Sequence, residues 1–241
     1  MGINLEKATK EMEKSFTVCL EKKAKQTGIE HEIFGAVKFA PDISGSMSSL
    51  YSNKKVQEVL ERLFVVALGL DDDGSMQVFP FSSKCEQLEK EVTIKNYEGF
   101  VDKEILKNRK NYYFGGTDYT PMLDEVYKDF KNNNKSGLFT KKKVTPSLVL
   151  CIVDGDTSRQ SKVKETIIEL SKEPIFFIFF GIGNDSFRFL KDLDTMSGRY
   201  IDNAAFYNVN SIDSLSDKDL YDMIAEQYVE WFYQMKQRNK I

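Results

Sequence analysis

The sequence predicts an α/β protein with a doubly wound, mostly parallel central sheet flanked by helices on both faces. Short apolar runs alternate with segments whose apolar residues recur at helical spacing, which is the pattern of such sheets. The runs in residues 147–158 (SLVLCIVDGDTS) and 175–183 (IFFIFFGIG) are continuously apolar, as strands buried on both faces are. A chain of 241 residues with 41% hydrophobic side chains is long enough to bury one large core.

The expected elements follow from the spacing of apolar residues along the chain. Residues 1–28 predict an amphipathic N-terminal helix that packs on a main domain of residues 29–241. Within that domain we expect strands at 33–44, 75–82, 147–158, 175–183 and 204–209, with 89–94 as an antiparallel edge strand paired with 75–82. The expected helices are 56–70, 98–110, 121–132, 163–172, 187–193 and 215–236.

Composition narrows the class of protein. The 34 basic and 37 acidic residues give a net charge of -3, which argues against a nucleic-acid-binding protein. The three cysteines are widely spaced, so neither a disulfide scaffold nor a cysteine-rich zinc module is expected. No stretch resembles a signal peptide or reaches the ~20 apolar residues of a membrane span. We therefore expect a cytoplasmic protein, of undetermined oligomeric state.

Three polar loops follow or border the predicted strands: DISGSM (42–47), GGTD (115–118) and DGDT (154–157). In doubly wound sheets, ligands bind beyond the carboxyl ends of the strands, so the three loops are expected on one rim. Their oxygen-bearing side chains form the candidate site, which comprises Asp42, Ser44, Ser46, Thr117 and Asp154.

The chemistry of this set favours a hard divalent cation. Two carboxylates brought together without a nearby cation would repel each other. Carboxylate and hydroxyl oxygens suit Mg²⁺, with Mn²⁺ and Ca²⁺ as alternatives, and argue against Zn²⁺ or Cu²⁺. Taken alone, the D-x-S-x-S loop also fits an ordinary turn, because Asp, Ser and Gly are common turn residues. The other two loops make the turn alone an insufficient explanation.

These motifs resemble the metal-ion-dependent adhesion site of von Willebrand factor type A domains. DISGSM, GGTDYTP and LVLCIVDGD stand in the family's order, and residues 52–82 and 95–101 are similar to the tellurium-resistance branch (TerF-like) of bacterial proteins. The resemblance implies a Rossmann-like type A fold in which Ser44, Ser46 and Thr117 bind the ion directly. Asp42 and Asp154 would then hold it largely through waters.

By the same resemblance the protein is expected to be a non-enzymatic interaction module. Neutral hydroxyls next to the metal leave it poorly neutralised, so a carboxylate from a partner protein would complete the site. The docking rim is expected to include Met47, Tyr51, Asp118, Tyr119 and Asp156. Asp156 has a second interpretation, as a cap for the helix that begins near residue 158.

Two alternatives stay open. The segment LVLCIVDGDTS also resembles the first motif of haloacid-dehalogenase-type phosphohydrolases, with Asp154 as nucleophile and Asp156 as its acidic partner around Mg²⁺. That interpretation leaves DISGSM and GGT without a role. The second alternative is a purely structural type A domain whose metal site is degenerate.

Overall fold

The central sheet contains five strands, all parallel. They are β1 (Ala36–Pro41), β2 (Met76–Val78), β3 (Ser147–Val153), β4 (Ile175–Gly181) and β5 (Ala204–Asn208), in the order β2-β1-β3-β4-β5. This computed structural model describes residues 2–29, 32–135, 143–209 and 215–241, with side chains from residue 9 onward. The doubly wound sheet predicted from the sequence is confirmed.

The expected antiparallel edge strand is wrong. Residues 89–94 contribute one isolated antiparallel bridge, between Met76 and Val92. The side chain of Asn96 interrupts any longer pairing, because its Oδ1 accepts from Thr93 N at 2.7 Å and its Nδ2 donates to the Glu91 carbonyl at 2.9 Å. These bonds turn the chain away from the sheet directly after the bridge.

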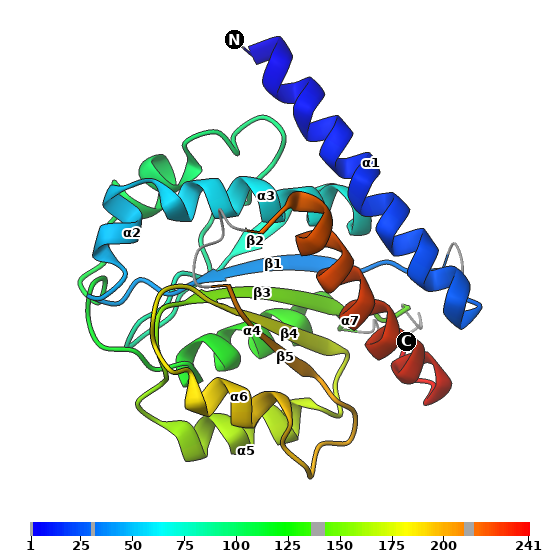
Figure 1. Cartoon of the computed structure of the whole chain (residues 1–241). Coiled ribbons are helices and arrows are strands. Elements are labelled where there is room, and N and C mark those ends of the chain that lie inside the picture. Colours follow the sequence, from blue (N-terminus) through cyan, green and yellow to red (C-terminus); the bar gives the residue numbers. More distant parts are fainter. Residues whose placement is uncertain (1, 30–31, 136–142, 210–214) are drawn as a thin grey trace.

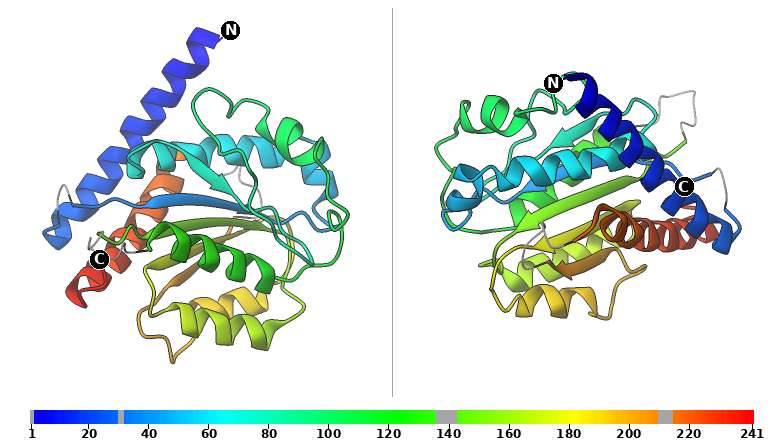
Figure 2. Two further views of the ribbon diagram at one scale, coloured as in Figure 1. Left: turned by 180° about the vertical axis from the view of Figure 1, so that it is seen from behind. Right: turned by 45° about the horizontal axis from the view of Figure 1, so that its top comes forward.

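Helices cover both faces of the sheet (Figures 1 and 2). One face carries α1 (Gly2–Thr27), α3 (Lys55–Leu70) and α7 (Asp217–Gln237), and the other carries α4 (Thr120–Asn133), α5 (Gln160–Leu170) and α6 (Arg188–Asp194). A short helix α2 (Ser48–Ser52) precedes α3, and the helix expected over 98–110 is a π-helical turn, η1 (Val101–Leu106). Each expected helix from 121 onward is present within a few residues of its predicted bounds.

The core consists of two apolar layers, one on each face of the sheet. Alternate strand residues point to opposite faces, so Leu150 and Ile178 lie in the layer under α3 and α7, whereas Cys151 and Phe179 lie in the layer over α4 and α5. The N-terminal helix belongs to the first layer. Its Phe16 packs edge-on against Tyr221 of α7, with ring centroids 5.8 Å apart.

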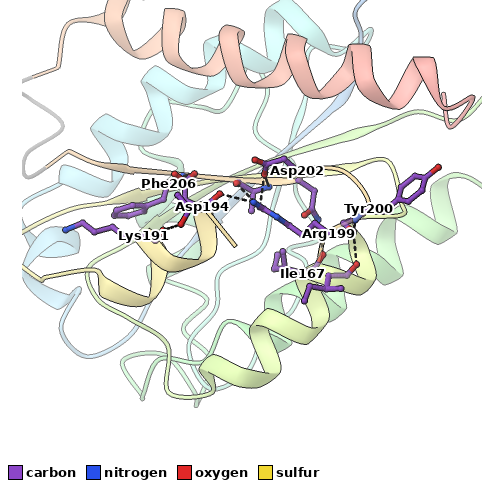
Figure 3. A network of polar contacts seen from close by, with 12 residues as sticks. Ile167, Lys191, Asp194, Arg199, Tyr200, Asp202 and Phe206 are labelled. Carbon is purple, nitrogen blue, oxygen red and sulfur yellow. Dashed lines mark hydrogen bonds and ion pairs between the residues drawn. The ribbon is translucent and has the colours of Figure 1, made fainter. Parts of the chain in front are cut away.

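A polar network ties the edge strand β5 to the rest of the fold (Figure 3). The Arg199 guanidinium pairs with Asp202 at 2.7 Å and donates to the Asp194 carbonyl at 2.8 Å. Asp194 Oδ1 accepts from Phe206 N at 3.0 Å, and Tyr200 N donates to Ser171 Oγ at 2.7 Å. The network satisfies backbone groups where the sheet has no further strand. Among the described helices, none is long and apolar enough to cross a membrane.

Candidate metal centre

The predicted ligand loops meet where the strand order reverses. The chain runs from β1 outward to β2 and then crosses back to β3, so β1 and β3 are neighbours whose following loops diverge. Open α/β sheets bind ligands in the crevice at this point. Asp42 directly follows β1 and Asp154 directly follows β3. Both strands end at the left of the sheet in Figure 1.

Hydrogen bonds join the first and third loops through their side chains. Ser46 Oγ donates to Asp154 Oδ1 at 2.8 Å, and the hydroxyls of Ser44 and Ser46 lie 3.1 Å apart. Asp42 Oδ1 accepts from Ser44 N at 2.7 Å, which folds the D-x-S-x-S loop over the end of β1. The structure therefore brings four of the five predicted ligands into one continuous series of hydrogen bonds.

The loop that carries Thr117 is attached to both of the others by its backbone. Gly45 N donates to the Gly115 carbonyl at 2.9 Å, and Ser158 N donates to the Thr117 carbonyl at 3.0 Å. A Cβ on Gly45 would lie 3.3 Å from the Phe114 carbonyl, a tight contact that would force this carbonyl to shift by a few tenths of an ångström. Thr117 thus lies between the loops of Asp42 and Asp154, although no hydrogen bond links its hydroxyl to theirs in the described residues.

Electrostatics at Asp42 suit a cation. The side chain is fully buried, and its Oδ2 has no hydrogen-bond partner. Burial raises the pKa of Asp42 to about 7, and the Asp154 carboxylate adds to that rise. Burial also raises the pKa of Asp154, with a contribution from Asp185. An ion bound here would compensate the lost solvation of both carboxylates.

The donor set fits a hard divalent ion completed by hydroxyls. In the described residues, no three His, Cys, Asp or Glu side chains converge, so a cluster of carboxylates alone is not available. The five side chains that would hold Mg²⁺ are Asp42, Ser44, Ser46, Thr117 and Asp154. All of them offer the oxygen ligands that Mg²⁺ prefers.

The aromatic and methionine rim expected from the sequence is wrong. Met47 and Tyr119 are fully buried and Tyr51 is 2% exposed, so none of the three presents a surface to a partner. Helix α2 turns Tyr51 back into the core, where its hydroxyl donates to the Asp42 carbonyl at 3.1 Å. Tyr119 packs between Phe81 and Phe179, and its hydroxyl donates to the Gly155 carbonyl. These side chains hold the ligand loops in place from beneath.

The two acidic residues assigned to the rim are also engaged elsewhere. Asp118 is buried, accepts from Thr120 N at 2.9 Å at the start of α4, and pairs with Arg159 at 3.2 Å. Asp156 does not cap α5, as one interpretation expected, because its Oδ2 accepts from Phe189 N of α6 at 3.1 Å. The other oxygen of Asp156 is buried without a partner.

The sequence analysis missed three residues at this edge. Phe114 adopts a left-handed backbone (φ 60°) and donates its N–H to the Ile43 carbonyl at 2.6 Å, which pins the second loop to the first. Arg109 lies over the Phe114 ring. Asp185, in the loop after β4, lies beside Gly155 of the loop after β3. Asp185 could have been predicted from the sequence, because it follows a clear strand and ligands bind beyond the carboxyl ends of strands. The positions of Phe114 and Arg109 depend on a tertiary fold that the sequence pattern does not reveal.

Comparison with known proteins agrees with this arrangement. Residues 35–241 match the family described as the vWA domain found in the TerF C terminus. The uncharacterized protein YcbR of Bacillus subtilis (strain 168) is 34% identical over 226 residues, which cover 92% of this chain and 89% of YcbR.

Solved structures with low sequence identity share the fold. Proximal thread matrix protein 1 from the mussel byssus, solved with a zinc-occupied MIDAS motif, superposes with a TM-score of 0.55 at 16% identity over 81% of this chain and 48% of its own. A von Willebrand factor type A protein from Catenulispora acidiphila gives 0.52 at 14% identity, over 82% of this chain and 42% of its own. The present chain thus spans about half the length of these proteins or less. With the family match over 35–241, the chain belongs to the von Willebrand factor type A family, in its TerF-like branch.

Proposed function

We propose that the protein is a non-enzymatic, Mg²⁺-dependent module that binds other proteins. The ion is held by Asp42, Ser44, Ser46, Thr117 and Asp154, with Mn²⁺ or Ca²⁺ as substitutes, and an acidic side chain of the partner completes its coordination. Family membership supports the class of module, and the solved zinc-occupied MIDAS motif of the mussel protein supports a metal at this place in the fold.

One observation carries the proposal: Asp42 Oδ2 is buried without a hydrogen-bond partner, in a carboxylate whose other oxygen accepts from Ser44 N. Leaving such an oxygen unsatisfied is costly, and a cation removes that cost. The bonded chain from Ser44 through Ser46 to Asp154 presents its oxygens from two adjacent loops. When bound, Mg²⁺ supplies a positive centre with an open position for an external carboxylate. Because three of the five ligands are uncharged, the two carboxylates no more than balance the charge of the ion, and the neutral hydroxyls leave it able to attract an external carboxylate.

The phosphohydrolase alternative has less support. It requires Asp154 and Asp156 to act together on one substrate, whereas one oxygen of Asp156 is engaged by the backbone of α6. It also gives no role to the first two loops, which the fold places beside Asp154. Mg²⁺-dependent hydrolysis of an aryl phosphate that disappears in Asp154→Asn would restore that alternative.

The proposal has two further parts, the biological role of the module and its location. We link the module to tellurium or stress resistance, because the matching domain is one found in TerF. A cytoplasmic location stays the expectation drawn from the sequence, as a second part of this proposal. A deletion strain with unchanged tolerance to tellurite and to related stresses would contradict the link to resistance.

Calorimetric titration of the metal-stripped protein with Mg²⁺, Mn²⁺ and Ca²⁺ tests the site itself. We expect one ion per chain in the unaltered protein and no binding in Asp42→Asn, whose neutral amide keeps the shape of the carboxylate. Thr117→Ala is expected to weaken binding by about tenfold or more, because one oxygen ligand is lost.

Ser49→Ala is the matched control. This exposed serine lies in helix α2, three residues beyond Ser46, and the loss of its hydroxyl should leave the affinity unchanged. Equal ion binding by the unaltered protein and by Asp42→Asn would place the ion elsewhere and contradict the proposal. Absence of binding in both would favour a structural domain with a degenerate site.

A further inference from the structure

The surface around the metal centre is divided by charge. On the side of the second loop, residues 105–117 contain Lys107, Arg109 and Lys110 and no acidic residue. On the opposite side, Asp185 follows β4 and is exposed. The second loop is hydrogen-bonded to the loop after β1 through Gly45, and Asp185 lies beside Gly155 in the loop after β3, so a segment bound across these loops meets positive charge at one end and negative charge at the other.

Arg109 is held close to the ligand loops by a defined contact. Its guanidinium carbon lies 4.9 Å from the centroid of the Phe114 ring. Phe114 is itself pinned by its N–H to Ile43, and its carbonyl lies against Gly45, at the centre of the D-x-S-x-S loop. The aromatic ring therefore positions the guanidinium at the rim although the side chain is exposed.

Among the described residues, none accepts a hydrogen bond from the Arg109 guanidinium. Its one recorded contact is with Phe114, and no carboxylate pairs with it in the part of the chain that the structure describes. The neighbouring Lys110 reaches Glu86 at 3.5 Å. A planar guanidinium fixed on a ring and lacking a carboxylate suits two-point recognition of an incoming carboxylate.

Asp185 makes the opposite side of the site negatively charged. A Cβ on Gly155 would lie 3.7 Å from Asp185 Oδ2, so this carboxylate lies directly beside the loop that carries Asp154. Its other oxygen accepts from Phe187 N at 2.8 Å, which fixes its direction. An acidic side chain of a partner placed on this side would meet like charge.

From this arrangement we infer that the partner segment carries two acidic side chains, of which one binds the metal and the other pairs with Arg109. The segment lies across the site with this second side chain on the side away from Asp185. The inference rests on the proposed metal-dependent docking and adds a specificity residue and a direction to it. Arg109 then selects among acidic partners, and Asp185 excludes the reversed orientation.

Titration of the isotope-labelled protein by NMR in saturating Mg²⁺ tests this inference. The probes are synthetic Gly/Ser peptides with one glutamate, with a second glutamate on either side of it at varied spacing, or with lysine in place of the second glutamate. The best two-glutamate peptide should bind about three- to tenfold more tightly than the one-glutamate peptide, and the advantage should shrink as salt rises. Arg109→Gln should remove that advantage and leave Mg²⁺ affinity unchanged, whereas Arg109→Lys should retain part of it.

Two variants complete the design. Arg238→Gln is the control, because Arg238 also lies over an aromatic ring, that of Tyr200 at 5.5 Å, but at the far end of the molecule from the strand ends. It should change nothing. Asp185→Asn should let the peptide with its second glutamate on the other side bind as well as the preferred one.

The outcomes separate the inference from the function on which it rests. Mg²⁺-dependent binding that is equal for one- and two-glutamate peptides, or that is indifferent to Arg109→Gln, overturns the role of Arg109 and leaves the metal-dependent docking intact. Absence of Mg²⁺-dependent binding by every peptide overturns both.

Discussion

Two buried charged residues, Lys38 in strand β1 and Asp42 directly after it, have opposite surroundings in the fold. Lys38 is fully buried in the middle of the strand, where its ammonium pairs with Asp129 of α4 and donates to Gln77 of β2. Asp42 is equally buried at the end of the strand, but one of its oxygens has no partner. Burial raises the pKa of Asp42, and the nearby Asp154 carboxylate raises it further.

The difference separates a structural charge from a functional one. The groups that surround the Lys38 ammonium, Asp129 and Gln77, belong to the chain itself, so folding alone satisfies this buried charge. Burial lowers the pKa of Lys38, and the Asp129 carboxylate opposes that effect. Around Asp42 no salt bridge to a basic group is found in the described residues, and the proposed cation would supply the positive charge there.

Breaking the structural pair is expected to have the largest effect on stability. Lys38→Met leaves the buried Asp129 without its ammonium, and loss of one partner of a buried pair costs about 3–5 kcal/mol. Urea denaturation should show this loss as a lower midpoint with an unchanged slope. The Mg²⁺ affinity of the fraction that is folded should be close to that of the unaltered protein.

The double variant Lys38→Met with Asp129→Leu distinguishes a missing charge from a packing defect. It should recover most of the lost stability, because neither charge is then left alone in the core. If the stability losses of Lys38→Met and Asp129→Leu, each measured alone, simply add in the double variant, the two residues do not act as a pair.

The unpaired carboxylate predicts a pH dependence of the metal-free protein. The folded-state pKa of Asp42 is about 7, against an ordinary value of 3.8, so the folded chain holds a proton that the unfolded chain has already released. Stability should therefore fall as the pH rises from 5 to 8, by about 2–3 kcal/mol from this group. Denaturant titrations of the metal-stripped protein across this range measure it.

Asp42→Asn is the control for that dependence. The amide does not titrate, so this variant should lose the Asp42 part of the slope and, when stripped of metal, should be more stable than the unaltered protein at pH 8. Mg²⁺ should flatten the slope of the unaltered protein only. A slope that is the same in both proteins would assign the pH dependence to other groups.

The contrast between these two clusters also explains what could be predicted from the sequence. The loops of the candidate site lie just beyond apolar strands, and parallel strands bring such loops to one edge whatever the details of packing. Asp42 and Asp154 could therefore be placed together from local pattern alone. The Lys38–Asp129 pair could not, because its members are 91 residues apart and one of them lies on a helix face that resembles any solvated face.

The rim failed for a related reason. Met47, Tyr51 and Tyr119 stand next to the ligand residues in the sequence. Because aromatic and methionine side chains favour interfaces, the sequence predicts these three at the exposed rim. In the fold, α2 and the start of α4 turn these side chains inward, so they pack beneath the loops. Whether a large side chain beside a loop lines the surface or supports the loop depends on the backbone direction at that residue, which composition and spacing do not specify.

Tyr51 offers the smallest effect, and it tests the supporting role directly. Tyr51→Phe keeps the ring that packs edge-on against Phe114 but removes the hydroxyl that donates to the Asp42 carbonyl. We expect a loss of about 1 kcal/mol in stability, the usual value of one buried hydrogen bond. Denaturant titration measures that loss, and calorimetry should show Mg²⁺ affinity within about twofold of the unaltered value. If instead the variant kept full stability and lost partner binding, Tyr51 would belong to the docking surface after all.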